Sequence, residues 1–321
     1  MDIINPSWVD LLDSYRFSLK AANRSPKTIS WYLDILERFF RFLSESGLLK
    51  PISEIGTSEV REYILYLQQA ERWPNNPHIT QKGKLSPYSV QGHVRAIRAF
   101  WGWLYDEQHI DHNALIKFPL PKVPHKIMPT LTIEQIKMLL SKIDRHTSGG
   151  AKFYCILLLL IDTGVRISEL VNIKLSDLNL IMGYARVTGK GGKERVVPIY
   201  KTTRKELMLY INHMRSKLCP LESPYLFPDP AGDHITVGSI QQYLKRLARK
   251  AGLNGIRCSP HVFRHTFATQ SAAADANVFA LKDIMGHSSL QTTLKYTHLT
   301  AGDLKNHHNK FSPVAALTEG E

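Results

Sequence analysis

The chain of 321 residues has 43% hydrophobic residues and a formal charge of +13, which is enough length for two domains and enough apolar content for ordinary cores. The positive charge and a pI near 9.6 favour a polyanionic partner. The longest apolar run, residues 155–161, is far too short to span a bilayer, so a membrane-spanning protein is excluded.

The three cysteines, Cys155, Cys219 and Cys258, are an odd number without metal-ligand spacing. This pattern favours a reducing compartment over a disulfide framework. Residues 1–15 contain neither a basic stretch nor a long apolar stretch, so no signal peptide is predicted. We expect a soluble, cytoplasmic protein without a cofactor or a bound metal.

The basic excess is concentrated in the later part of the chain. Residues 1–122 hold 15 Lys and Arg against 13 Asp and Glu, whereas residues 123–321 hold 26 against 15. A basic protein can also be merely a soluble cation, so charge alone leaves nucleic-acid binding undecided.

The first part of the chain shows helical periodicity without strand patterns, which predicts a small all-α domain over residues 1–118. Ser25-Pro26 marks the start of its second helix and Gly47 the end, and Thr57 or Ser58 is expected to cap the third. The four predicted helices cover residues 7–22, 27–46, 57–70 and 89–108.

The fourth helix is expected to expose His93, Arg95 and Arg98. These side chains form either a solvated surface or contacts to DNA phosphates. The preceding loop, residues 71–87, holds three prolines and is long for a compact bundle. The sequence does not decide whether that loop faces DNA or is a disordered insertion.

Residues 119–129, PLPKVPHKIMP, contain four prolines and show no periodicity, which predicts an extended linker with a domain boundary near residue 123. Lys122 and Lys126 in this linker are further candidates for DNA contact. A basic tether would suit a clamp around a duplex, although a plain linker has the same composition.

The second domain, residues 130–321, begins with a helix through Ile143 that Thr132 and Gln135 cap. Residues 151–161 predict a helix buried on all sides, and Arg166 follows its end directly. Two β-rich runs, residues 184–188 and 195–199, flank a glycine-bearing turn that carries Lys190, which predicts a hairpin. Further helices are predicted over residues 202–217 and 237–252.

Residues 259–298 supply four polar side chains at definable places. Ser259 and Pro260 suit the start of a helix, which places His261 and Arg264 on one face near an N-terminus that favours phosphate. Gly286 ends the next helix, so that His287 emerges at a turn. A last short helix, capped by Ser288 or Ser289, carries Tyr296.

Taken singly, each of these residues has an ordinary structural interpretation. His261 and His265 are four apart, but no glutamate of the HExxH type lies between them and no third ligand is evident. Taken together, they suit the attack of a tyrosine on a phosphodiester without metal. Arginines hold the non-bridging oxygens, a lysine or histidine protonates the leaving oxygen, and the tyrosine holds the phosphate covalently. The sequence shows no acidic cluster for Mg²⁺ and no Walker A motif.

Five ordered motifs carry a resemblance to a known family. They are Thr-Gly-Val-Arg-Ile-Ser-Glu-Leu at 163–170, Gly-Lys-Gly-Gly-Lys-Glu-Arg at 189–195, His-Val-Phe-Arg-His-Thr-Phe-Ala-Thr at 261–269, Met-Gly-His-Ser-Ser at 285–289 and Tyr-Thr-His at 296–298. The chain resembles the tyrosine recombinases of the phage integrase family over essentially its whole length. In layout it is similar to Xer-type and transposon-encoded members.

The resemblance implies a role for each matching residue. Arg166 and Arg264 would clamp the scissile phosphate, and Lys190 would be the general acid, with Lys193 as its rival. His261 would bond the phosphate or relay a proton, His287 would support the phosphate, and Tyr296 would be the nucleophile that forms a 3′-phosphotyrosine. Glu169 resembles an orienting carboxylate.

The resemblance also implies an architecture and an assembly. The fold would combine an all-α, SAM-like core-binding domain with a mainly α catalytic domain that holds a small antiparallel sheet. Four protomers would hold two sites on double-stranded DNA and exchange strands through a Holliday junction. In the tail at 300–321, residues 300–313 are either a segment that docks on a neighbour or an ordinary frayed C-terminus. Alternatives are a type IB-like DNA-relaxing enzyme and a degenerate relative that only binds DNA.

Overall fold

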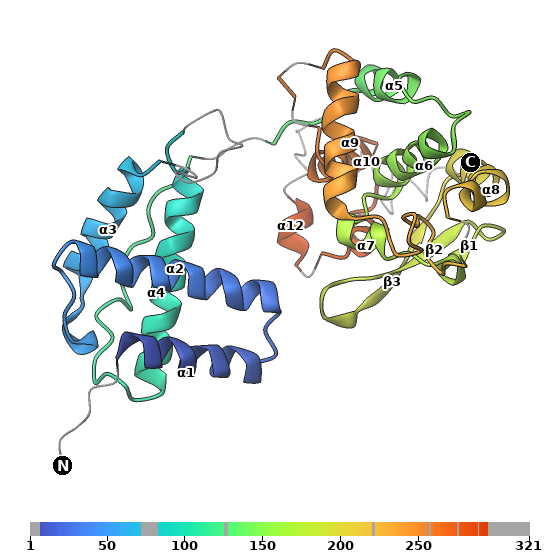
Figure 1. Ribbon diagram of the computed structural model, residues 1–321. Coiled ribbons are helices and arrows are strands. Elements are labelled where there is room, and N and C mark those ends of the chain that lie inside the picture. The colour runs from blue at the N-terminus through green and yellow to red at the C-terminus, as the bar shows by residue number, and fades with distance from the viewer. Residues whose placement is uncertain are drawn as a thin grey trace, which may run out of the picture. The chain divides into compact units, whose positions relative to one another are not determined.

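The computed structural model describes residues 7–71, 83–124, 128–219, 222–253, 255–256, 258–274, 276–287 and 289–294. The chain divides into two compact units, residues 1–126 and residues 127–321 (Figure 1). The first unit is helical, and the second combines helices with a small sheet. No helix in the described ranges has both the length and the apolar content needed to cross a membrane.

All four helices predicted for the first unit are present, each within two residues of the predicted bounds. They are α1 (Trp8–Ala21), α2 (Pro26–Glu45), α3 (Thr57–Gln69) and α4 (Pro87–Asp106), with a short 3₁₀ turn at Ile52–Glu54. The cap of α3 differs from the prediction: Gly56 is the N-cap, because its backbone N–H donates to the Glu59 carboxylate at 2.8 Å. The side chain of a glutamate in the first turn thus replaces that of a capping residue.

Aromatic side chains fill the core of the first unit, where α2 packs against α1, α3 and α4. Phe39, Phe40, Tyr63 and Phe100 are fully buried, and Trp101 is nearly so. Most of these rings meet edge-on or tilted, with centroids 5.0 Å apart for Phe39 and Tyr63, and the rings of Phe40 and Trp101 are stacked, geometries that favour aromatic pairs. The predicted loop at 71–87 lies mostly outside the described residues, and its ends meet in a bridge between Glu71 and Lys84.

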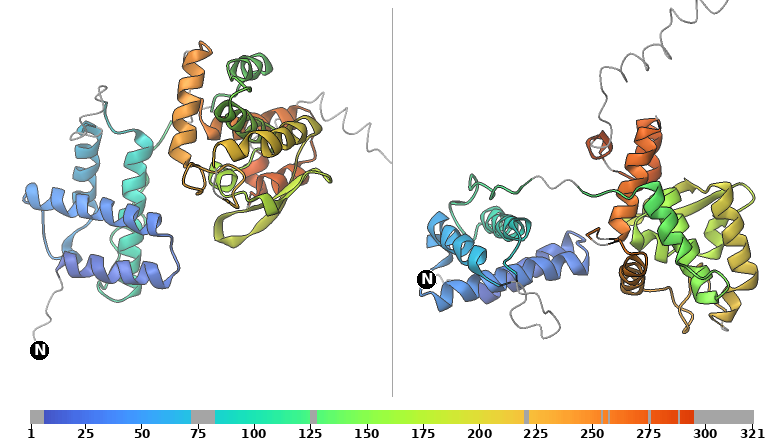
Figure 2. Two further views of the ribbon diagram at one scale, coloured as in Figure 1. Left: turned by 45° about the vertical axis from the view of Figure 1, so that its right-hand side comes forward. Right: turned by 90° about the horizontal axis from the view of Figure 1, so that it is seen from above.

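The second unit is built around α6 (Ser148–Thr163), which packs against α7 (Ile167–Val171), α8 (Lys201–His213) and α10 (Pro260–Ala273) (Figure 2). None of residues 151–161 is exposed, but Tyr154, Leu158 and Ile161 on one face are half-buried, so the prediction of a helix buried on all sides holds only in part. The other helices are α5 (Ile133–Ser141), α9 (Val237–Lys250), α11 (Val278–Met285) and α12 (Leu290–Leu294).

A three-stranded antiparallel sheet of order β1-β2-β3 covers one part of this unit. The predicted hairpin is formed by β2 (Tyr184–Thr188) and β3 (Glu194–Pro198), in register from Tyr184 opposite Pro198 to Thr188 opposite Glu194. The short strand β1 (Leu178–Asn179) was not predicted, because two residues are too few to show a period of two.

Helix α11 packs on the unit through a small hydrophobic cluster and through Ile284, which packs against the main core. Leu281 and Met285 of α11 pack against Ala268 of α10.

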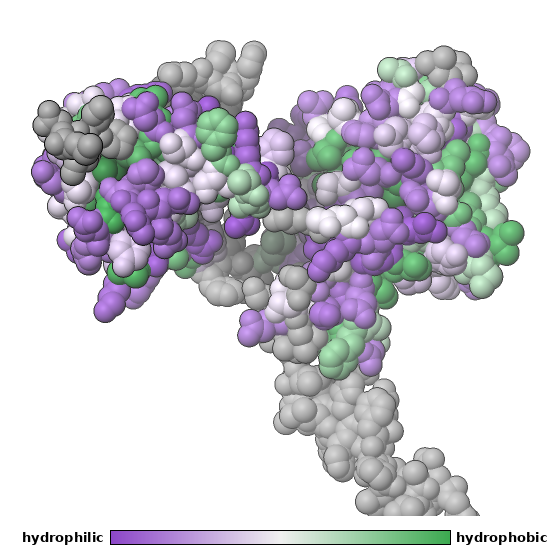
Figure 3. Space-filling model, turned by 90° about the horizontal axis from the view of Figure 1, so that it is seen from below, coloured by the Kyte–Doolittle hydropathy of each residue, from purple (hydrophilic) through white to green (hydrophobic). Residues whose placement is uncertain are grey.

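Hydrophilic side chains cover most of the face of each unit shown in Figure 3, and separate hydrophobic patches lie among these side chains.

Candidate active site

Arg166 lies at a sharp turn between two helices. Helix α6 ends at Gly164, whose φ of +59° lies in the left-handed region that glycine favours. A Cβ atom at Gly164 would also collide with the ring of Phe267. Arg166 is then the N-cap of α7, so the local sequence places its side chain at the start of that helix.

Glu169, in the first turn of α7, is the carboxylate around which the site is arranged. It is 3% exposed and accepts hydrogen bonds from the backbone N of Arg166 at 2.9 Å and from its Nη1 at 2.8 Å. Arg195 of β3 donates to the same carboxylate through Nη1 at 2.9 Å and Nη2 at 2.8 Å. Burial raises the pKa of Glu169, but the bonds from Arg195 and Arg166 outweigh burial and lower it. Glu169 is therefore ionised beside two guanidinium groups.

Arg264 is buried in α10, next to the turn that carries Arg166. Its Nη1 donates to the Gly164 carbonyl at 2.7 Å and its Nη2 to the Met285 carbonyl at 2.7 Å. Both of these acceptors are neutral, so neither cancels the charge of the guanidinium. The contacts fix the plane of the Arg264 fork against α6 and α11.

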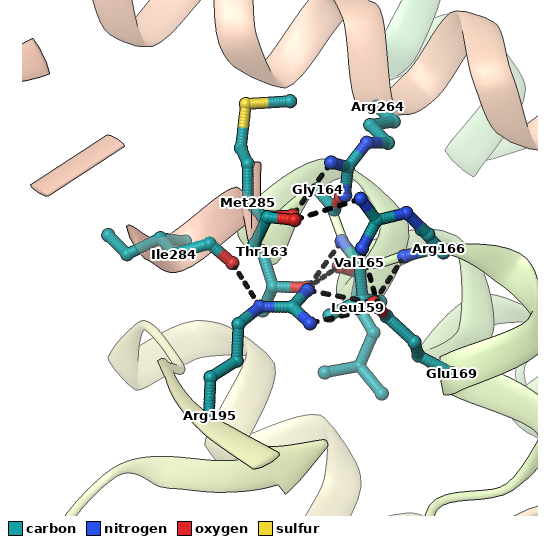
Figure 4. Close-up of polar contacts among 11 residues, drawn as sticks. Leu159, Thr163, Gly164, Val165, Arg166, Glu169, Arg195, Arg264, Ile284 and Met285 are labelled. Atoms are coloured by element: carbon teal, nitrogen blue, oxygen red, sulfur yellow. Dashed lines mark hydrogen bonds and ion pairs between the residues drawn. The ribbon is translucent and has the colours of Figure 1, made fainter. Parts of the chain in front are cut away.

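Three consecutive carbonyls at the end of α11 each accept a hydrogen bond from a different arginine, and Figure 4 shows those of Ile284 and Met285. Ile284 accepts from Arg195 Nε at 2.7 Å, Met285 from Arg264, and Gly286 from Arg166 Nη2 at 2.9 Å. The last carbonyls of a helix lack partners inside the helix and carry the negative end of its dipole. The end of α11 therefore gathers the three cations into one place.

His287 follows these carbonyls directly, at the turn after Gly286 as predicted. Its Nδ1 is 2.9 Å from Oγ1 of Thr293 in α12, a residue with no exposed surface. Burial, and then the charges of Arg264, Arg166 and Arg195, lower the pKa of His287 to about 4. His287 is therefore neutral at pH 7, with one ring nitrogen able to donate and the other to accept.

The structure describes the remaining predicted site residues unequally. His261 is exposed in the first turn of α10. The backbone of Lys190 lies in the tight turn between β2 and β3, as predicted, and Lys193 is exposed at the end of that turn. The side chain of Lys190 and the whole of Tyr296 lie outside the described part of the chain. Across the described ranges, no group of three or more His, Cys, Asp and Glu side chains could hold a metal ion.

The candidates for DNA contact in the first unit differ in exposure. Arg95 is exposed, and with Arg98 it lines a hollow of about 450 Å³ beside α4. Arg98, also predicted to be exposed, is half-buried and donates to the Ile116 carbonyl at 3.1 Å, so that prediction holds only in part. The prediction of an exposed His93 is wrong, because this ring is half-buried and its Nδ1 is 2.9 Å from the hydroxyl of Tyr63. Lys122 is exposed, and Lys126 lies outside the described residues.

Comparison with known proteins identifies the family of the chain. A model of the phage integrase family matches residues 129–302, and a model of the phage integrase N-terminal SAM-like domain matches residues 11–111. Tyrosine recombinase XerC of Bacillus pumilus is 32% identical over 297 residues, covering 91% of this chain and 92% of that protein. The chain belongs to the phage integrase family of tyrosine recombinases. Tyrosine recombinase XerD of Listeria innocua is 29% identical over 309 residues, 95% of this chain and 99% of that protein.

Solved recombinase structures share the fold of this recombinase. The XerH site-specific recombinase bound to its difH substrate has a TM-score of 0.68 at 22% identity, over 92% of this chain and 82% of that one. The Tn1549 transposon integrase in complex with transposon right end DNA has a TM-score of 0.71 at 22% identity, over 94% and 99%. The predicted fold class, a SAM-like helical domain and a mainly helical catalytic domain with a small antiparallel sheet, is confirmed.

Sequence reasoning gave no role to two residues of this recombinase that the structure brings into the site. Arg195 closes the motif at 189–195, and its place at the end of a conspicuous Gly-Lys-Gly-Gly-Lys-Glu-Arg stretch was the available signal. Thr293, which contacts His287, stands in no motif. Its contact depends on how α12 packs, which local patterns do not encode.

Proposed function

We propose that this recombinase cuts and rejoins double-stranded DNA at a specific site through a 3′-phosphotyrosine intermediate. The observation that carries the proposal is the convergence of Arg166 and Arg264 on the end of α11, beside His287. Arg166 and Arg195 share one carboxylate, and Arg264 bonds to two neutral carbonyls. Among the described residues, three guanidinium groups and one carboxylate, that of Glu169, lie where a phosphate would bind, an arrangement that suits a negative charge.

In the proposed reaction, the Tyr296 hydroxyl oxygen attacks the scissile phosphorus and the bond from phosphorus to the 5′-oxygen breaks. Arg166 and Arg264 hold the non-bridging oxygens of the pentavalent phosphate. Lys190 gives a proton to the departing 5′-oxygen, while His261 takes the tyrosine proton. A 5′-hydroxyl from a second strand reverses these steps, so the exchange uses neither metal nor ATP.

His287, being neutral at working pH, would donate one hydrogen bond to the phosphate and add no charge. The excess positive charge would then come from the arginines alone. Its contact with Thr293 places α12, which precedes Tyr296, against the phosphate-binding groups. His287 would thus both support the phosphate and position the segment that precedes the nucleophile.

We assign residues 1–118 to a core-binding domain, residues 119–129 to a basic linker and residues 130–321 to the catalytic domain. Arg95, Arg98, Lys122, Lys126 and Lys193 are proposed to contact the DNA backbone. The active form would be a homotetramer on two sites that resolves a Holliday junction, with the C-terminal tail at 300–321 reaching a neighbour. Integration of a mobile element and resolution of a DNA dimer use this same chemistry in the cytoplasm.

The deciding experiment uses a nicked suicide substrate that traps the covalent adduct. Wild-type protein is expected to form a protein–DNA adduct and Tyr296→Phe none, because phenylalanine lacks the attacking oxygen. Adduct formation by Tyr296→Phe would show that another residue is the nucleophile. If wild-type protein formed no adduct on its own site, the result would favour a protein that only binds DNA. Relaxation of supercoiled plasmids that lack a site would favour the DNA-relaxing alternative.

The general acid is tested by replacing Lys190 and Lys193 separately with alanine. Lys190→Ala is expected to slow cleavage by about 10² or more with little loss of binding, as removal of general acid catalysis does. Lys193→Ala should mainly weaken DNA binding and make that binding less sensitive to salt, because an exposed lysine acts on phosphates as a point charge. The opposite result would assign the acid to Lys193.

A further inference from the structure

Arg195 spans three elements of the catalytic unit with a single side chain. It starts on β3 and reaches the carboxylate of Glu169 on α7 and the Ile284 carbonyl at the end of α11. Its Nε and both of its terminal nitrogens donate, at 2.7, 2.9 and 2.8 Å, and the side chain is only 14% exposed. A guanidinium is the one side chain that can supply such a planar, three-point fork.

The contacts of Arg195 control the groups that are proposed to bind the phosphate. Glu169 Oε1 accepts from Arg195 Nη1 and also from Arg166 Nη1, at 2.9 and 2.8 Å. That oxygen and the Gly286 carbonyl together hold the Arg166 guanidinium. Arg195 also holds the Ile284 carbonyl, two residues before the carbonyl of Gly286 that Arg166 contacts.

Gly286 shows that the fit between Arg195 and α11 is close. Its φ is +64°, and a Cβ atom built there would lie 2.9 Å from Cζ and Nη1 of Arg195. The guanidinium thus lies against bare backbone at the residue before His287. Both the left-handed conformation and the close approach require glycine at this position.

We propose that Arg195 is a positioning residue for strand cleavage, which orients the Arg166 guanidinium through Glu169 and sets the end of α11 that carries His287. The inference rests on the proposed recombinase function. Arg195 acts through these neighbours and contacts no reacting atom. Its loss leaves Glu169 paired with Arg166 alone and the Ile284 carbonyl without its donor, so that the phosphate-binding groups shift relative to the scissile phosphate.

The test compares Arg195→Lys and Arg195→Gln with wild type in the full-length chain. Binding is measured by mobility shift, and the rate of adduct formation is measured under saturating enzyme on the suicide substrate. Arg195→Lys keeps the charge but loses the fork, so binding is expected to stay within about twofold while cleavage falls by about 10². Arg186→Lys on the neighbouring strand, where Arg186 is exposed opposite Val196, is the matched control and should cleave at the wild-type rate.

A second substrate separates positioning from acid catalysis and from simple loss of stability. With sulfur in place of the leaving 5′-oxygen, departure needs no proton, so Lys190→Ala should recover cleavage whereas Arg195→Lys should stay slow. Recovery of Arg195→Lys on this substrate, or a wild-type cleavage rate for Arg195→Lys on the normal one, would overturn the proposal. A thermal melt checks that each variant is folded at the assay temperature. Failure of wild-type protein to form any adduct would instead contradict the recombinase function itself.

Discussion

Glu59 in the first unit and Glu169 in the second make the same capping contact at the start of a helix, but their other contacts give them different roles. Each is the third residue of a helix and accepts the backbone N–H of the N-cap, Gly56 at 2.8 Å and Arg166 at 2.9 Å. Each is also almost fully buried, at 4% and 3% exposure. The shared capping pattern stabilises the start of a helix in both cases.

The two carboxylates differ in the cations that they hold. Glu59 contacts the half-exposed Lys50, nine residues earlier, at 2.9 Å. Glu169 contacts Arg195, 26 residues later on another element, and that arginine reaches on to α11. A capping carboxylate such as Glu169 contributes to the site because its charge holds side chains from distant segments of the chain. The following variants test whether this difference in partners governs activity.

The largest effect is expected from Glu169→Gln, compared with Glu59→Gln. Glu169→Gln leaves two guanidinium groups facing a neutral amide, so we expect a loss of about 3–5 kcal/mol in unfolding free energy, typical of a broken buried ion pair. Cleavage should fall by about 10² as Arg166 loses its orientation. Glu59→Gln should cost about 1 kcal/mol, as lost caps do, and leave cleavage unchanged. Urea denaturation and the suicide-substrate assay measure both; equal cleavage rates would refute the contrast.

A second pair of variants, Gly286→Ala and Gly47→Ala, separates backbone strain from site geometry. Both glycines follow helices with φ of +64° and +67°, so alanine costs about 1–2 kcal/mol at each position. A Cβ at Gly47 meets open space, whereas at Gly286 it meets the Arg195 guanidinium. Gly286→Ala should therefore slow cleavage by about tenfold or more. Gly47→Ala should cleave normally once bound, and a cleavage defect there would point to strain alone.

A last prediction, which concerns stability at low pH rather than cleavage, is a dependence of stability on pH that arises from one histidine in each unit. The pKa of His93 is lowered to about 4 by burial and then by Arg38, and that of His287 is lowered to about 4 as described above. Both folded pKa values lie below the ordinary value of 6.5, so the unfolded chain takes up these protons first. The contribution of these two neutral histidines to the free energy of unfolding is fully present above pH 6.5 and declines as the pH falls from 6.5 towards 4.

All five tryptophans lie in residues 1–126, so tryptophan fluorescence follows the first unit separately. His93→Gln should flatten the pH dependence seen by fluorescence. His287→Gln should flatten the pH dependence of stability only in the second unit, where amide hydrogen exchange measures it. A fluorescence signal that responded to His287→Gln would mean that the two units unfold together.

The sequence predicted most of the fold because its signals were local. Helix periodicity, the Ser25-Pro26 and Ser259-Pro260 starts, and the glycine stops at Gly47 and Gly286 all act within one turn of the chain. Errors occurred where a local signal was ambiguous or absent. Glu59 capped α3 through Gly56, and β1 was too short to be recognised.

The candidate site was predicted by residue type more completely than by contact. The motifs identified Arg166, Arg264 and His287, and the structure brings these three together at the end of α11. The motifs did not reveal that Arg195 joins them, since a contact between β3 and α11 depends on packing across 89 residues. His93 was expected at the surface because its helical position did not reveal the hydroxyl of Tyr63 on α3.

The end of α11 also limits how the length of this segment can vary. Each residue added to or removed from a helix turns the following carbonyls by about 100° and moves them by about 1.5 Å along the axis. Because Ile284, Met285 and Gly286 each face a different arginine, an insertion or deletion within α11 would misalign all three pairs at once. Substitutions on its outer face, where Phe279 is 66% exposed, leave this register intact. Helix α11 can thus vary in surface chemistry but not in residue number.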